Sequence, residues 1–172
     1  PSVLLSPGTK RGSIAVLKAS LVNPFVEAAY KFLQEELNME VTRGQLRLES
    51  SKATSGEVNV ALGVTGDAEG IVIYSMSEKT AKAIASTLLN EPVPMFSELA
   101  ESSIAEMGNI ITGQAAAGLE EHGYVCKLTP PTIIGGKGVM ISTVDIQRLV
   151  IPIELPVGYI EISVALRYYQ KR

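Results

Sequence analysis

The sequence contains very little of the chemistry that metal sites and most nucleophilic enzymes use. Its 172 residues include one cysteine, one histidine and no tryptophan. The single cysteine, Cys126, excludes an internal disulfide and a thiol pair for zinc, and its apolar run, VCKL, is typical of a core position. His122 has no second histidine or cysteine nearby, so we expect it to serve at a helix end. We therefore expect no metal site and no cofactor of the protein's own.

Membrane-spanning, nucleic-acid-binding and targeting patterns are missing too. No apolar run reaches the ~18–20 residues that a membrane span needs, and Lys18 interrupts the run at 14–22. The net charge is −3 and the basic residues are scattered, so the chain has no electrostatic footprint for nucleic acid. The lone cysteine and the lack of a signal-peptide pattern predict a location in the reducing cytoplasm.

The motifs of the commonest nucleotide-binding and hydrolytic sites are also absent. The chain has no Walker loop, no dinucleotide fingerprint and no nucleophile elbow. The GGKG segment at 135–138 lacks the Ser or Thr and the helix that must follow in a phosphate-binding loop, so we predict a turn there. If the protein is an enzyme, we expect it to borrow part of its chemistry from a partner.

What the sequence does contain is a regular succession of helical and strand periods. The first predicted helix has Asn23 as its N-cap and Pro24 at its first position, and Ser77 caps the second. Apolar spacing predicts helices at 24–37, 78–91 and 97–122. Alternation predicts strands at 39–49, 57–64, 69–75, 125–129, 139–142, 148–155 and 158–167. Turn-forming residues at 51–55 and 65–67 separate the earlier strands.

This order of elements predicts an α+β fold. Because the links between strands are short, we expect a largely antiparallel sheet flanked by helices. The sequence of a helix, three strands and a second helix is followed by another helix with strands, which indicates an internal duplication. The first residues show no periodicity, so we treat 1–16 as an extension or a tag remnant and 17–172 as a single domain.

The segment at 101–118, ESSIAEMGNIITGQAAAG, is the most informative part of the chain. At ~100° per residue, the spacing i, i+4, i+7 and i+11 gathers four residues within a sector of roughly 60°. These are Ser102, Glu106, Asn109 and Gly113. A stripe of apolar residues lies on roughly the opposite side of the same helix, formed by Ile104, Met107, Ile111 and Ala115. The helix therefore has one face to bury and one polar face to present.

Helix propensity alone would not select these residues. A glycine such as Gly108 or Gly113 costs on the order of 1 kcal/mol in a helix interior, and Asn109 costs ~0.5 kcal/mol, relative to alanine. Residues of low helix propensity inside a helix, with no local interaction that compensates for them, indicate either a function or close packing. Both interpretations stay open here, because exposed Glu and Asn are usually just solvated and a helical glycine usually marks a close contact between elements.

At this point the residues support a resemblance. The pattern Ser102-x3-Glu106-x2-Asn109, followed about twenty residues later by Pro130-Pro131, resembles the active-site signature of the CheX/CheC/FliY family of chemotaxis phosphatases. EMGNIITGQAA is similar to the central helix of that family, and NPFVEAA to the start of its CheX members. The resemblance covers roughly residues 20–168. One copy of the signature is present, as in CheX, whereas CheC typically has two.

The resemblance implies a CheC-like fold and hydrolysis of the aspartyl phosphate on a CheY-type response regulator, which holds Mg2+ and a conserved lysine. It implies that Asn109 positions the attacking water and that Glu106 pairs with the regulator's lysine. Ser102 would then border the contact, while Gly108 and Gly113 would let the partner's backbone approach. Between the two prolines, Pro131 fits the spacing better.

The family also implies a homodimer that forms through edge strands. We take the strands at 148–155 and 158–167 as the candidate edges, because an unpaired alternating strand is open to strand addition. Two other functions remain open: a non-catalytic module that binds a response regulator or a flagellar-switch component, and a small-molecule sensor with a pocket between sheet and helices.

Overall fold

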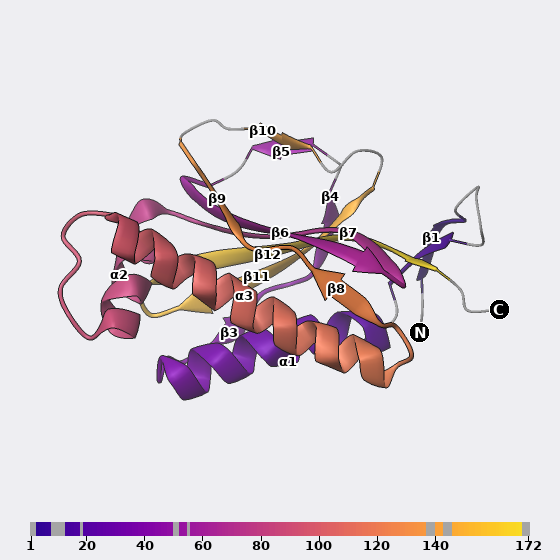
Figure 1. Cartoon of the computed structure of the whole chain (residues 1–172), viewed down its shortest axis with the longest axis horizontal. Helices are drawn as coiled ribbons and strands as arrows, with labels where there is room; N and C mark the ends of the chain where they lie inside the picture. Colours follow the sequence, from indigo (N-terminus) through magenta and orange to yellow (C-terminus); the bar gives the residue numbers. More distant parts are fainter. Residues whose placement is uncertain are drawn as a thin grey trace.

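The computed structural model describes residues 3–7, 13–17, 19–49, 52–54, 56–136, 140–142 and 146–169. A large sheet separates two unlike sides of the molecule (Figure 1). Helices α1 (Ala19–Lys31) and α3 (Glu98–Glu121) run along one face of this sheet, and α2 (Glu78–Leu89) lies near the start of α3. A small two-stranded sheet, β5 (Lys52–Thr54) with β10 (Met140–Ser142), lies over the opposite face.

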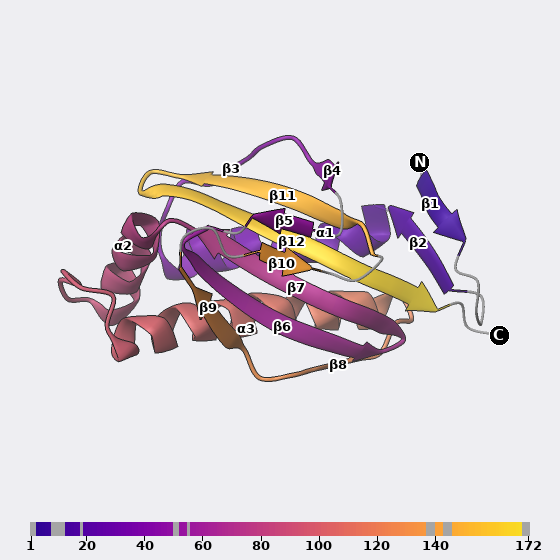
Figure 2. The ribbon, with the colours of Figure 1, turned by 90° about the horizontal axis from the view of Figure 1, so that it is seen from above.

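All strand pairs in the described ranges are antiparallel, which confirms the predicted α+β class. The long strands are β6 (Val58–Gly66), β7 (Ala68–Met76), β11 (Arg148–Leu155) and β12 (Gly158–Tyr169). Short strands lie outside them: β3 (Thr42–Arg43) and β4 (Arg47–Glu49) pair with β11, while β8 (Cys126–Leu128) and β9 (Thr132–Gly135) pair with β6. Figure 2 shows β12 between β11 and β7.

Every second side chain along the long strands faces the helices, and these side chains form the core. On β6 the helix-facing side chains are Val58, Val60, Leu62 and Val64, and on β12 they are Ile160, Ile162, Val164 and Leu166, all of them buried. The predicted apolar stripe of α3 packs onto this face, with Ile104, Met107, Ile111 and Ala115 at most 1% exposed. The apolar area removed from water in this way is the main stabilising contribution to the fold.

Serine side chains cap the first turns of α2 and α3, as the sequence predicted for Ser77. The Ser77 hydroxyl accepts a hydrogen bond from the Thr80 backbone N–H at 3.1 Å, and the Ser97 hydroxyl accepts one from the Ala100 N–H at 3.3 Å. Each bond satisfies one of the free N–H groups of a first helical turn. The start and length of α3 therefore agree with the sequence prediction.

The predicted start of the first helix is wrong. Helix α1 begins at Ala19, so Pro24 lies inside it, and it continues into a π-helical turn, η1 (Phe32–Glu36). The reason is burial: Leu21 and Val22, which precede the predicted cap, are at most 9% exposed and belong to the core. Their burial offsets the single backbone hydrogen bond that a proline cannot donate.

Several short strands also differ from the prediction. The predicted strand at 39–49 is two strands, β3 and β4, and the predicted turn at 51–55 contains β5. Strand β9 was not predicted; it includes Gly135, where a turn was expected, and 137–138 of the GGKG segment lie outside the described residues. Each of these strands has two to four residues, too few for a period to be recognised.

The first described residues form a hairpin that extends the sheet. Strands β1 (Val3–Pro7) and β2 (Ser13–Leu17) form a hairpin, and β2 pairs with the end of β12. The division of the chain at residue 16 stays a prediction, as does the internal duplication, although a helix, short strands and a long hairpin do occur twice in order.

The two strands proposed as edges for a dimer are not edges. Strand β12 pairs with β11, β7 and β2, and β11 pairs with β12, β3 and β4. Between β3 and β4, the Gly44 N–H donates to the Pro152 carbonyl at 2.8 Å, so the outer side of β11 is occupied there as well. This part of the dimer hypothesis is therefore wrong. Among the described residues, the structure has no helix long and apolar enough to cross a membrane.

Candidate functional site

Helix α3 presents the polar stripe that the spacing predicted. Ser102, Glu106 and Gly113 are exposed and Asn109 is partly exposed, while the apolar side of the helix is buried. Helix α3 contributes these four residues over three turns, with its buried side held against β6, β8 and β9. The structure therefore brings the predicted residues together on one accessible surface, here called the α3 stripe.

The two chemical groups of the stripe have no side-chain partner among the residues that the structure describes. In the described part of the chain, neither the Glu106 carboxylate nor the Asn109 carboxamide forms a side-chain hydrogen bond or an ion pair. A carboxylate accepts hydrogen bonds and pairs with cations, and a carboxamide both donates and accepts. The stripe thus offers one negative charge and one neutral bifunctional group, about one turn apart, to an external partner.

The structure corrects the role predicted for Gly108. Gly108 is buried, and a Cβ atom added there would lie 2.8 Å from Val60 Cγ1 and 3.4 Å from the Tyr74 ring. The missing side chain lets α3 approach the sheet and does not serve an external partner. By contrast, a Cβ atom added at Gly113 meets nothing within 4 Å, so this glycine does leave space in front of the stripe.

A buried hydrogen-bond chain, which sequence reasoning missed, fixes the turn that carries Asn109. The Thr112 hydroxyl donates to the Gly108 carbonyl at 2.7 Å, and the Tyr74 hydroxyl lies 2.7 Å from the Thr112 oxygen, where it acts as donor. Burial raises the pKa of Tyr74 well above its usual range, so the hydroxyl keeps its proton. The available signals were a tyrosine at a core-facing strand position and a threonine four residues after a glycine.

The remaining candidates are structural. His122 caps α3 and its Nδ1 lies 2.9 Å from the Gly118 carbonyl oxygen, which confirms the helix-end role. Cys126 is partly buried, and this burial raises the pKa of its thiol. Pro130 is exposed and Pro131 half-buried, directly before β9. Within the described ranges, no three His, Cys, Asp or Glu side chains gather as metal ligands.

A pocket of about 460 Å3 opens beside the first turns of α2 and α3. Its lining includes three glutamates, Glu57, Glu78 and Glu101, together with Phe96 and Ile133. The concentration of negative charge disfavours phosphate and other anions at this place. The pocket therefore gives no support to a sensor of anionic small molecules.

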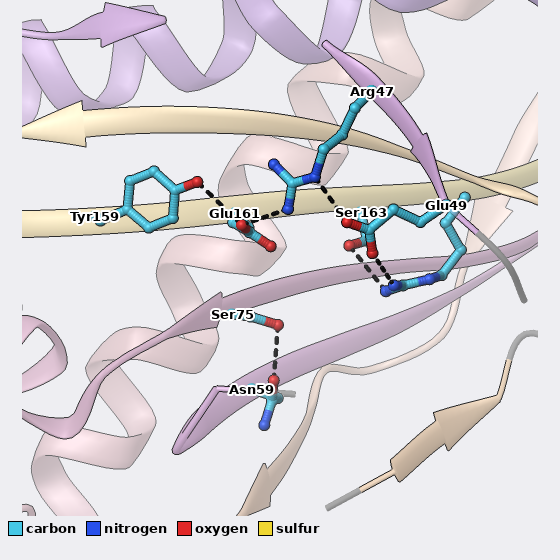
Figure 3. A network of polar contacts seen from close by, with 8 residues as sticks. Arg47, Glu49, Asn59, Ser75, Tyr159, Glu161 and Ser163 are labelled. Carbon is cyan, nitrogen blue, oxygen red and sulfur yellow. Dashed lines mark hydrogen bonds and ion pairs between the residues drawn. The ribbon is translucent and has the colours of Figure 1, made fainter. Parts of the chain in front are cut away.

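The face of the sheet opposite the helices carries a polar network (Figure 3). Arg148, 6% exposed, donates to Glu49 at 3.0 Å and to the Ser163 hydroxyl at 3.2 Å. Arg47 pairs with Glu161 at 2.6 Å and with Glu49 at 2.7 Å, and these carboxylates raise the pKa of its guanidinium. The network joins β4 to β11 and β12, which is a structural role.

Comparisons with known proteins agree with the fold. The family model of the chemotaxis phosphatase CheX matches residues 58–154. The CheY-P phosphatase CheX of Thermotoga maritima is 30% identical over 128 residues, covering 74% of this chain and 83% of that protein. The crystal structure of the chemotaxis protein CheX from Desulfovibrio desulfuricans has a TM-score of 0.78 at 26% identity, covering 85% of this chain and 98% of that chain.

A second solved structure contains a partner. The CheX–CheY–BeF3–Mg2+ complex from Borrelia burgdorferi matches with a TM-score of 0.76 at 31% identity, covering 87% of this chain and 99% of the matched chain. The family match extends over more than half of the sequence, and the matched segment contains all of α3. On this basis, the chain belongs to the CheX family of chemotaxis phosphatases.

Proposed function

We propose that this protein hydrolyses the aspartyl phosphate of a CheY-type response regulator. The observation that carries the proposal is the α3 stripe, where Glu106 is exposed and Asn109 partly exposed, and where neither side chain has a hydrogen-bond partner within the described part of the chain. The Thermotoga relative, named a CheY-P phosphatase, and the Borrelia complex of CheX with CheY support the same reaction and the same partner.

The reaction needs few groups from this chain. A water molecule attacks phosphorus, the bond from phosphorus to the aspartyl oxygen breaks, and the products are aspartate and inorganic phosphate. Mg2+ held by the regulator neutralises charge on the phosphoryl oxygens. A carboxamide cannot take a proton at neutral pH, so Asn109 acts by orienting the water in line with the bond that breaks. This use of a neutral side chain resembles the water-orienting glutamine of some GTPases.

The other stripe residues hold the partner. Glu106 forms a charge-assisted hydrogen bond with the regulator's lysine, which sets the register of docking. Ser102 borders the contact, and Gly113 leaves room for the regulator's backbone. A homodimer and a cytoplasmic location also remain predictions of this proposal. With β11 and β12 occupied on both sides, a dimer that extends the sheet has to use other strands.

The test is the decay of labelled phosphate from a CheY-type regulator, with and without this protein. We expect catalytic amounts of the protein to accelerate the decay and to release inorganic phosphate. Binding of the phosphorylated regulator without faster decay would instead support the non-catalytic module. Indifference to several such regulators would contradict the proposal.

Reversing the charge at Glu106 is expected to weaken docking. In Glu106→Lys, the new ammonium faces the regulator's lysine, and like charges brought together at an interface cost several kcal/mol. We expect the Kd for the beryllofluoride-loaded regulator to rise at least tenfold, measured by fluorescence titration at low salt.

The control for this variant is Glu121→Lys, which makes the same charge change at an exposed position on α3. Fifteen residues separate the two sites, or ~22 Å along the helix. The Kd of the control variant is expected to stay within about twofold of wild type. If both substitutions raise the Kd equally, the cause is the change in net charge, and Glu106 has no specific role in docking.

A further inference from the structure

Two large apolar side chains stand exposed at the start of α3. Met95 is 77% exposed and Leu99 is 56% exposed, and neither belongs to the core. Met95 lies just before the Ser97 cap, where its carbonyl accepts a hydrogen bond from the Ser97 N–H at 2.9 Å. Single exposed apolar residues are common on protein surfaces, but two within five residues of sequence, at the start of the helix that carries the α3 stripe, require an explanation.

The position of Leu99 relative to the α3 stripe provides that explanation. Leu99 precedes Ser102 by three residues and Glu106 by seven, the spacings that place side chains on one face of a helix. The rise from Leu99 to Glu106 is ~10 Å. Met95 lies four residues before Leu99, in the exposed segment that leads into α3. We call Met95 and Leu99 the apolar end of the stripe.

The charges around the apolar end indicate what it can contact. Glu98 is exposed beside Leu99, Glu101 follows on the next turn, and Glu106 lies at the centre of the stripe. An apolar pair with a negatively charged border is complementary to an apolar patch bordered by lysine or arginine. The lysine through which a regulator would engage Glu106 supplies one basic group of this kind.

We propose that Met95 and Leu99 form the apolar end of the regulator-docking surface and contact an apolar patch, bordered by basic side chains, on the phosphorylated regulator. This inference rests on the proposed function and adds residues that determine affinity without touching the reacting groups. A standard interface covers about 800 Å2 on each partner, equivalent to a disc of ~16 Å radius. A contact centred on Glu106 and Asn109 therefore reaches Leu99 and the loop before it.

The test measures binding (Kd and KM) and the chemical step (kcat) separately in one variant. In the double variant Met95→Ser/Leu99→Ser, we expect the Kd for the beryllofluoride- and Mg2+-loaded regulator to rise at least tenfold. We expect the KM for the phosphorylated regulator to rise in parallel, while kcat stays within twofold of wild type. Loss of Asn109 affects kcat instead. Thermal unfolding of the variant is expected to match wild type, because both side chains lie outside the core.

The matched control is Leu48→Ser, at a leucine that is 40% exposed on β4, across the sheet from α3 (Figure 2). It is expected to leave Kd and KM unchanged. An unchanged Kd and KM in the double variant would overturn the inference while the activity of the wild type still stood. A changed oligomeric state of the double variant in light scattering would also overturn it, in favour of a contact between copies. If the wild type neither binds nor dephosphorylates any regulator, the proposed function fails and takes this inference with it.

Discussion

Replacing Asn109 with alanine is expected to lower the rate of regulator dephosphorylation by about 100-fold or more, because the attacking water loses the group that orients it. The fold is expected to remain intact. Asn109 is partly exposed, and no described side chain forms a hydrogen bond with it. Alanine is also the better helix former by ~0.5 kcal/mol, so the variant should be at least as stable as wild type. The release of labelled phosphate and the urea unfolding curve measure the two effects.

A matched control lies five residues further along the same helix. Gln114→Ala removes an exposed carboxamide from α3, but five helical steps turn its side chain by ~140° away from Asn109. This control is expected to keep the wild-type kcat. Near wild-type turnover in Asn109→Ala, or an equal loss in Gln114→Ala, would contradict the water-orienting role. Binding of the loaded regulator should persist in Asn109→Ala, since Glu106 still carries the docking charge.

Replacing Gly108 with valine is expected to destabilise the fold by about 2 kcal/mol or more, because the new side chain overpacks a closed contact. Its Cβ atom would lie 2.8 Å from Val60 Cγ1, on a residue that is itself completely buried, and valine adds two methyl groups beyond that atom. Relief of this contact pushes α3 away from the sheet, which also strains the hydrogen bond between the Tyr74 hydroxyl on β7 and the Thr112 hydroxyl on α3. The free energy of unfolding in urea is the measurement.

Gly113→Val makes the same substitution on the same helix without the overpacking. A Cβ atom at Gly113 meets nothing within 4 Å, and valine is a slightly better helix former than glycine. The stability of this control is expected to stay within ~0.5 kcal/mol of wild type. Similar unfolding free energies for both variants would mean that α3 and β6 accommodate a valine at position 108 without cost. That result would contradict the close packing inferred there.

Gly108 and Gly113 show which features of α3 follow from helical spacing and which depend on the neighbouring sheet. Spacing alone placed Ser102, Glu106, Asn109 and Gly113 on one face, because 3.6 residues per turn is a property of every α-helix. Both glycines were expected to face a partner. The helical period puts Gly108 ~20° from Ala115 and ~160° from Glu106, so spacing already favoured the buried side for this glycine. The structure adds that Val60 fills the space in front of it.

The same distinction applies to the edges of the sheet. The alternation in β11 and β12 predicted both strands, and it carried no information about their neighbours. Strands β3 and β4 cover β11 through pairs separated by about a hundred residues in the chain. The Tyr74 hydroxyl likewise reaches Thr112 across thirty-eight positions of sequence, so the chain that supports Asn109 has no local signature.

By itself, the sequence determined the α+β class, the three helices, the long strands, the cap at Ser77 and the face on which Glu106 and Asn109 lie. These features follow from local periodicity and from hydrogen bonds between near neighbours, which a linear pattern contains. The tertiary structure alone decided where α1 begins, which strands are edges, what fills the space in front of Gly108 and what anchors α3. Those outcomes depend on burial and on contacts between distant segments, whose energies exist only once the chain has folded.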